Sequence, residues 1–376
     1  MRRPKFLPPI DPFLLWLLGT VAAASLLPAR GMVADWFGIA ADVAIALLFF
    51  LHGAKLSRAA IVQGIGNWRL HLLVLGSTYI LFPVVGLATA AVDRWWIDPL
   101  LGSGLLFLTL LPSTVQSSIA FTALARGNVA GAVCSASLSN LLGIVLTPLL
   151  VGLFMRTGGS GALTSWGSVQ TIALQLLLPF VSGHLLRPLI GGLVDRNKAI
   201  LQPVDRSSIL LVVYTAFSAA VVNGIWQRVG IGELAVLLVL SAVILAIVMA
   251  VNALVARAVG LPREDAIVLL FCGSKKSLVS GVPMAAALFA PATVGLVVLP
   301  LMIFHQLQLF ACAGLAARFS RQAQEREAAE VPQGAEAATA TAATLGFAIP
   351  DPCMPGVVAN LALLGRHAAT LSGERP

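Results

Sequence analysis

The sequence contains little charge. Of its 376 residues, 11% are Asp, Glu, Lys or Arg, whereas 58% are hydrophobic. Soluble domains carry about 25% charged residues, so this chain has too few to cover a surface that faces water. The alternation of apolar and polar residues that is typical of outer-membrane barrels is also missing. These absences exclude a soluble domain and predict an all-α integral membrane protein embedded in the lipid bilayer.

Cysteine and metal-binding patterns are equally scarce. The four cysteines stand singly, without a CxxC pair, and three of them lie in apolar runs, as is typical of small packing residues. No DDxxD-like, HxxxH or ExxH spacing occurs, which argues against a metal-dependent intramembrane enzyme. The net charge of +8 does not cluster on one predicted element, so no nucleic-acid partner is expected. We expect no catalytic residue and no cofactor.

Long apolar runs occupy most of the chain. They have roughly the 17–25 residues that a helix needs to cross a bilayer. Ten runs are recognised, at residues 12–28, 36–54, 70–92, 98–124, 129–154, 168–190, 207–226, 232–258, 264–290 and 293–317. The predicted organisation is an N-terminal segment at 1–11, a five-helix repeat at 12–154, a loop at 155–167, a second repeat at 168–318 and a disordered tail at 319–376.

The distribution of Lys and Arg predicts the orientation. With ten spans, most basic residues outside the tail fall on the side of the N-terminus, whereas Arg30, Arg94, Arg156 and Arg228 fall on the other. Basic loops stay in the cytoplasm, so both termini are expected there, in the cell (inner) membrane.

The fourth and ninth spans contain helix-breaking residues at their centres. Because each repeat would have an odd number of helices, the second would lie inverted relative to the first. Broken helices at matching positions of inverted repeats mark a transporter's binding site. In the fourth span Pro112 is followed by Ser113, Thr114, Gln116, Ser117 and Ser118. In the ninth, Gly273 precedes Ser274, Lys275, Lys276 and Ser277, and Gly281 and Pro283 follow. These polar residues are predicted to line one shared cavity.

Lys275 and Lys276 are the most unusual residues of the sequence. A lysine at the bilayer centre costs about 2.5–3.5 kcal/mol on insertion scales, so it should be paired, hydrated or functional. Adjacent residues cannot face the same way on a helix, so we expect one lysine to reach the cavity and the other to snorkel or pair. The alternative is a purely structural ion pair, for which Asp42 is the main candidate partner.

Polar residues of the fifth and tenth spans extend the predicted cavity. Ser135 and Ser139 lie four residues apart, on one helical face, with Asn140 beside them. His305 and Gln306 mark the tenth span. Packing serines and a histidine that is simply hydrogen-bonded are the alternatives.

Two strings at the breaks resemble the bile acid:sodium symporter family. PSTVQSSIAFTALARGNVAGAVCSASLSNLLG and FCGSKKSLVSGVPMA are similar to the subgroup that contains bacterial proteins and the orphan vertebrate member, and the resemblance covers roughly Phe13 to Ala317. It implies ten helices in two inverted repeats. The first, second, sixth and seventh helices would form a panel, the other six a core with the crossing broken helices, and core would move against panel in alternating access.

The same resemblance locates the family's sodium ligands. Ser118 stands where the family has a liganding serine and is the candidate Na⁺ ligand, but Ile119 replaces an asparagine. Phe271 replaces the liganding glutamate and Lys275 the glutamine. A site without a carboxylate and with a lysine at its edge should bind Na⁺ weakly. Either the ammonium takes the electrostatic role of sodium, or an anionic substrate pairs with it.

The sequence therefore predicts a secondary active transporter that moves a small organic, anionic solute by alternating access. The alternative is a membrane protein of transporter fold that acts as a sodium-independent carrier or as a regulator without net symport.

Overall fold

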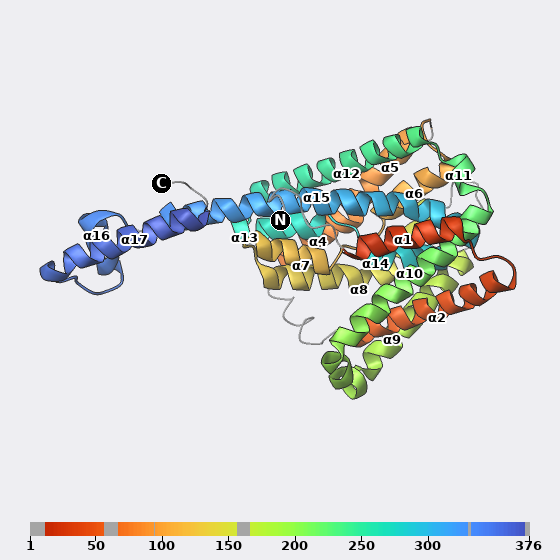
Figure 1. Ribbon diagram of the computed structural model, residues 1–376, viewed down its shortest axis with the longest axis horizontal. Coiled ribbons are helices and arrows are strands. Elements are labelled where there is room, and N and C mark those ends of the chain that lie inside the picture. The colour runs from red at the N-terminus through yellow and green to blue at the C-terminus, as the bar shows by residue number, and fades with distance from the viewer. Residues whose placement is uncertain (1–11, 56–66, 94, 156–165, 330–331, 373–376) are drawn as a thin grey trace.

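The computed structural model describes residues 12–55, 67–93, 95–155, 166–329 and 332–372 (Figure 1). All regular structure in these ranges is helical. Eight helical segments are long and apolar enough to cross a membrane, and shorter apolar helices lie at Leu15–Leu26 and Pro99–Thr109. The chain is thus a multi-pass membrane protein, as its composition predicts. The predicted N-terminal segment 1–11 and most of the predicted loop 155–167 lie outside the described residues.

Helices cover each of the ten apolar ranges. In the first half they are α1 (Pro12–Leu26), α2 (Met32–Lys55), α4 (Trp68–Gly76), the π-helix η2 (Ser77–Leu81), α5 (Phe82–Asp93), α6 (Pro99–Thr109), α7 (Gln116–Leu124) and α8 (Val129–Phe154). In the second half they are α9 (Trp166–Arg196), α10 (Lys198–Val222), the short α11 (Ile225–Arg228), α12 (Ile231–Ala258), α13 (Arg263–Gly273), α14 (Leu278–Leu288) and α15 (Pro291–Ala329).

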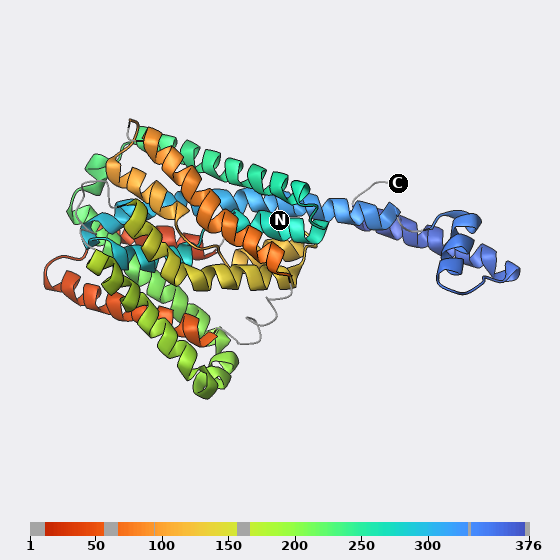
Figure 2. The ribbon, with the colours of Figure 1, turned by 180° about the vertical axis from the view of Figure 1, so that it is seen from behind.

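Helices α1, α2, α9 and α10 pack together, and α10 also packs on α15. Helix α2 packs along α9 and α10, and α1 packs on α10. In both views α2 and α9 lie along one edge of the molecule and α12 along the opposite edge (Figures 1 and 2). The α13–α14 segment lies between them. In its apolar stretch 94% of the residues are buried inside the protein, whereas in that of α12 only 28% are buried. The second broken helix is therefore enclosed by protein and not by lipid.

Carboxylates tie the helix ends together at two places. The two oxygens of Asp265 accept hydrogen bonds from the amides of Asn67 and Asn128, each at 2.8 Å, which joins the starts of α4, α8 and α13. The carboxylate of Glu233, on α12, accepts from the backbone N–H of Asp98, the N-cap of α6, at 2.9 Å. These contacts hold the outer ends of both broken helices in place.

The C-terminal region differs from the prediction of disorder at 319–376. Helix α15 continues to Ala329, and two further helices follow, α16 (Gly334–Thr344) and α17 (Met354–Ser372), with a 3-10 turn at Asp351–Cys353. Helix α17 packs on α15 and α16 at the far end of the molecule (Figure 1). Residues 322–343 are rich in Ala, Glu and Gln, which are strong helix formers.

Candidate functional site

The two broken helices cross at their breaks and bond to each other there. Helix α6 ends at Thr109 because Pro112 disfavours helical backbone before it, and α7 begins at Gln116. In the gap, the carbonyl of Pro112 accepts a hydrogen bond from the N–H of Ser277 at 2.9 Å. The hydroxyl of Ser113 donates to the carbonyl of Cys272 at 2.5 Å. Unwound backbone inside a membrane protein needs such partners, and each break supplies them to the other.

The second break is shorter than predicted. It covers only residues 274–277, between the end of α13 and the start of α14. The hydroxyl of Ser277 caps α14 by accepting the N–H of Ser280 at 3.1 Å. Gly281 and Pro283 were expected to interrupt the helix as well, but α14 continues through both. Proline is tolerated inside membrane helices because neighbouring groups satisfy the freed carbonyl.

Lys276 carries its ammonium into a cage of backbone oxygens. Its Nζ donates hydrogen bonds to the carbonyls of Thr78 (2.9 Å), Thr109 (2.8 Å) and Leu111 (2.6 Å), and lies 4.1 Å from the ring centroid of Phe82. Two of these carbonyls belong to the C-terminal end of α6, where backbone acceptors lack helical partners and the helix dipole is negative. All three protons of the ammonium are thereby used.

The backbone of Lys276 is held by α15. Its N–H donates to Oε1 of Gln308 at 2.8 Å, and Nε2 of Gln308 donates to its carbonyl at 3.0 Å. The same Nε2 lies 2.8 Å from Nδ1 of His305. Gln306, the residue predicted for the site, has a buried amide nitrogen without a hydrogen-bond partner among the described residues.

Lys275 lies on the other side of the break. Its Nζ donates to the carbonyl of Ser117 at 2.9 Å and sits over the rings of Phe121 (4.1 Å) and Phe271 (5.4 Å). Both lysines are 0% exposed. Within the part of the chain that the structure describes, neither forms an ion pair, and Asp42 is exposed on α2. The alternative of an ion pair with Asp42 is therefore wrong, because carbonyls and ring faces, not a carboxylate, surround each ammonium.

Besides Ser113, four predicted serines bond to neighbouring helices or to their own helix instead of lining the cavity. Ser118 donates to the carbonyl of Phe271 at 3.3 Å, and the hydroxyl of Ser139 accepts the N–H of Ser113 at 3.1 Å. The remaining two serines are Ser135, which bonds to His71 at 2.7 Å, and Ser274, which donates to Leu270. The Ser118 hydroxyl is thus bonded to the backbone of Phe271, the residue that stands where the family has a liganding glutamate.

A cavity of about 530 Å³ opens beside the crossing. This volume is within the usual range of sites for small molecules, roughly 300–1,000 Å³. The predicted residues that line it are Thr114, Gln116, Ser117, Asn140, Ser277 and His305. Neither lysine of the break lines it, in contrast to the prediction that one would reach the cavity.

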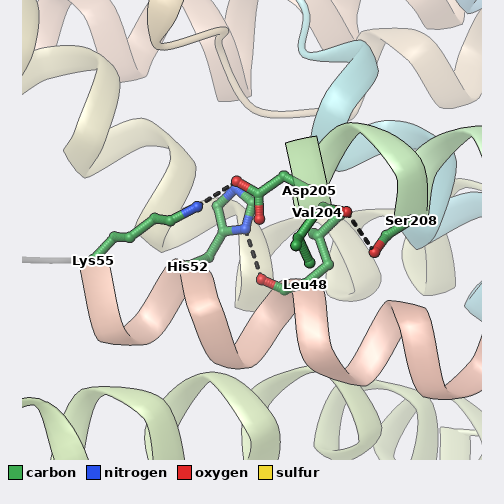
Figure 3. A network of polar contacts seen from close by, with 6 residues as sticks. All are labelled: Leu48, His52, Lys55, Val204, Asp205 and Ser208. Carbon is green, nitrogen blue, oxygen red and sulfur yellow. Dashed lines mark hydrogen bonds and ion pairs between the residues drawn. The ribbon is translucent and has the colours of Figure 1, made fainter. Parts of the chain in front are cut away.

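The opposite wall of the cavity contains a charged cluster that the sequence did not single out. Lys55 of α2 forms an ion pair with Asp205 of α10, and the imidazole of His52 lies beside them, its Nδ1 donating to the carbonyl of Leu48 at 2.8 Å (Figure 3). Gln202 and Arg206 of α10 line the same wall. These residues stand at or near the ends of apolar runs, so in the sequence they resemble orientation signals.

Comparison with known proteins supports the resemblance at the breaks. The model of the SBF-like CPA transporter family matches residues 11–321. The Escherichia coli (strain K12) protein named "Putative symporter YfeH" is 56% identical over 323 residues, which cover 85% of this chain and 96% of the relative. Sodium/bile acid cotransporter 7 of Danio rerio is 26% identical over 275 residues, covering 71% of this chain and 80% of the relative. The chain therefore belongs to the SBF-like CPA transporter family.

Proposed function

We propose that the protein is a secondary active transporter that moves a small organic anion across the membrane by alternating access. The observation that carries this proposal is the crossing of two broken helices beside one cavity. In transporters built from inverted repeats, discontinuous helices of this kind form the substrate site. The ten helices would divide into repeats at 12–154 and 168–318.

The cavity lies between the proposed panel and the proposed core. One wall comes from α1, α2, α9 and α10, which correspond to the expected panel and contribute His52 and Phe180. The other comes from the breaks and from α8 and α15, with Thr114 and Asn140. Movement of one group against the other would expose the site to each side in turn.

In this proposal the transporter does not depend on sodium, because Lys276 supplies a tethered cation at the crossing. The melting temperature of the purified protein is then expected to be the same in Na⁺, K⁺ and choline at fixed ionic strength. A ligand that binds the folded state alone would raise it by mass action. A saturable rise specific to Na⁺ and lost in Ser118→Ala would contradict the proposal and restore sodium symport.

Transport itself is tested by uptake into proteoliposomes of ¹⁴C-labelled small carboxylates, sulfonates and phosphate diesters. We expect uptake of at least one compound above that of protein-free liposomes. If a compound binds the purified protein but none is taken up, the protein is a regulator of transporter fold.

Lys275→Met is expected to lower this uptake about tenfold while the protein still inserts. A hydrogen bond from a charged donor contributes about 1.5–3 kcal/mol, and here it fixes the carbonyl of Ser117, a residue that lines the cavity. Uptake by the variant at the wild-type rate would exclude this positioning role. Arg257→Gln, on the exposed face of α12, is the matched control.

A further inference from the structure

The charges of the cavity are confined to one wall. Among the described residues that line it, the charged ones are Lys55, Asp205 and Arg206, all on α2 and α10. The wall formed by the breaks offers hydroxyl and amide groups, among them Thr114 and Asn140. A molecule in the cavity would therefore meet charge on one side and neutral hydrogen-bonding groups on the other.

The cluster carries one uncompensated positive charge. Lys55 and Asp205 form an ion pair and cancel each other, which leaves Arg206 when His52 is neutral. The guanidinium of Arg206 lies 5.5 Å over the ring of Phe13. No hydrogen bond or ion pair of that guanidinium is found within the described part of the chain. A guanidinium has five N–H donors, and its planar fork matches the two oxygens of an acid group.

We propose that Arg206, together with Lys55, binds the single acid group of the substrate, and that Asp205 occupies Lys55 when the site is empty. This inference rests on the proposed transport function and specifies its substrate class. A monoanion neutralises the cluster, a dianion leaves one negative charge unpaired, and a cation is repelled by Arg206. The substrate is therefore a small organic monoacid, a carboxylate or sulfonate with uncharged polar groups for the opposite wall.

A purely structural role for the cluster makes a different prediction. If the ion pair only joins α2 to α10, loss of Asp205 should harm the protein and loss of Arg206 should leave ligand binding unchanged. In the proposed site Arg206 and Asp205 have opposite effects on the binding of the acid group. Arg206 attracts the acid group, whereas Asp205 competes with it for Lys55.

The experiment measures the melting temperature of the full-length protein in detergent. The probes are small carboxylates, sulfonates and phosphate diesters, each paired with its neutral amide or ester, together with dicarboxylates and amines. Ligands that bind only the folded state raise the free energy of unfolding by RT ln(1 + [L]/Kd), and the melting temperature rises with it. We expect monoacids to stabilise the protein. Their neutral partners, the dicarboxylates and the amines should leave the melting temperature unchanged. If no monoacid raises the melting temperature more than its neutral partner does, the proposal is overturned.

Variants then identify the residues. Arg206→Gln is expected to weaken binding of the stabilising acid at least tenfold, whereas Asp205→Asn binds it as tightly as wild type or more tightly. Arg257→Gln should behave as wild type. If Arg206→Gln does not fold, Arg206→Lys, which keeps the charge but loses the planar fork, should still bind more weakly. Unchanged binding in the Arg206 variant, or weaker binding in a folded Asp205→Asn, overturns the site.

The two proposals fail in different ways. An acid that binds through Arg206 but is never taken up into proteoliposomes refutes transport and leaves the acid site in place. An acid that is taken up equally by wild type and Arg206→Gln refutes the acid site and leaves transport in place.

Discussion

The Lys276→Met variant is expected to melt at least about 6 °C below the wild-type protein. Methionine fills nearly the same space but has no donor, so the carbonyls of Thr78, Thr109 and Leu111 lose their shared partner. An unpaired buried acceptor costs about 1–3 kcal/mol, which gives a total of roughly 3–9 kcal/mol for three. In a domain of 150–250 residues each kcal/mol shifts the melting temperature by about 2–4 °C. Thermal unfolding in detergent, followed by tryptophan fluorescence, measures the change.

Lys275→Met is the matched control. It deprives one carbonyl, that of Ser117, and two ring faces of their cation, so it should lower the melting temperature clearly less. A Lys276→Met protein that melts within about 2 °C of wild type would show that the carbonyl cage does not depend on the ammonium.

A second variant tests what the cage recognises. Lys276→Ala removes the whole side chain and leaves three carbonyl oxygens around an empty space. Ethylammonium or Na⁺ is expected to raise the melting temperature of this variant, because either cation replaces the missing charge, and to leave the wild type unchanged. Such a gain would identify the lysine as the tethered counterpart of a mobile cation. Equal responses in both proteins would argue against that role.

The breaks of the broken helices could be predicted from the sequence because local chemistry decides them. Pro112 disfavours helical backbone before it, and a glycine followed by polar residues weakens a helix, so both gaps were found. Gly281 and Pro283 carry the same local signal, yet α14 runs through them. There, burial inside the molecule overrides the local preference, and burial depends on residues distant in the sequence.

The surroundings of the lysines and the charged wall could not be predicted for the same reason. The cage of Lys276 joins η2, α6 and α13–α14, which are separated by up to 198 residues. Asp205 lies 150 residues from Lys55. Periodicity and composition describe a single helix and its faces, whereas these contacts follow from how helices pack. The helices of the C-terminal region were missed for another reason, because the prediction of disorder did not take into account that Ala, Glu and Gln are strong helix formers.

Gly53→Ala is expected to destabilise the protein and to remove acid binding together. Helices α2 and α9 touch through backbone, because a Cβ at Gly53 would lie 1.9 Å from the carbonyl oxygen of Phe180, and one at Gly183 would lie 2.0 Å from that of Phe50. Small residues allow such close approach in membrane helices. The backbone cannot change rotamer to avoid the added methyl group as a side chain can. The variant is therefore expected to lose at least about 3 kcal/mol of stability, the upper end of the usual cost of overpacking.

The functional effect follows from position. Gly53 stands directly after His52 and two residues before Lys55, so separating α2 from α9 displaces both from the wall of the cavity. Gly38→Ala, on the same helix, is the control, since no atom lies within 4 Å of its added Cβ. Alanine is the better helix former by about 1 kcal/mol, so this variant should melt at or slightly above the wild-type temperature and bind acids normally. If Gly53→Ala matches Gly38→Ala in melting temperature and in acid binding, the close contact between α2 and α9 does not position the charged wall.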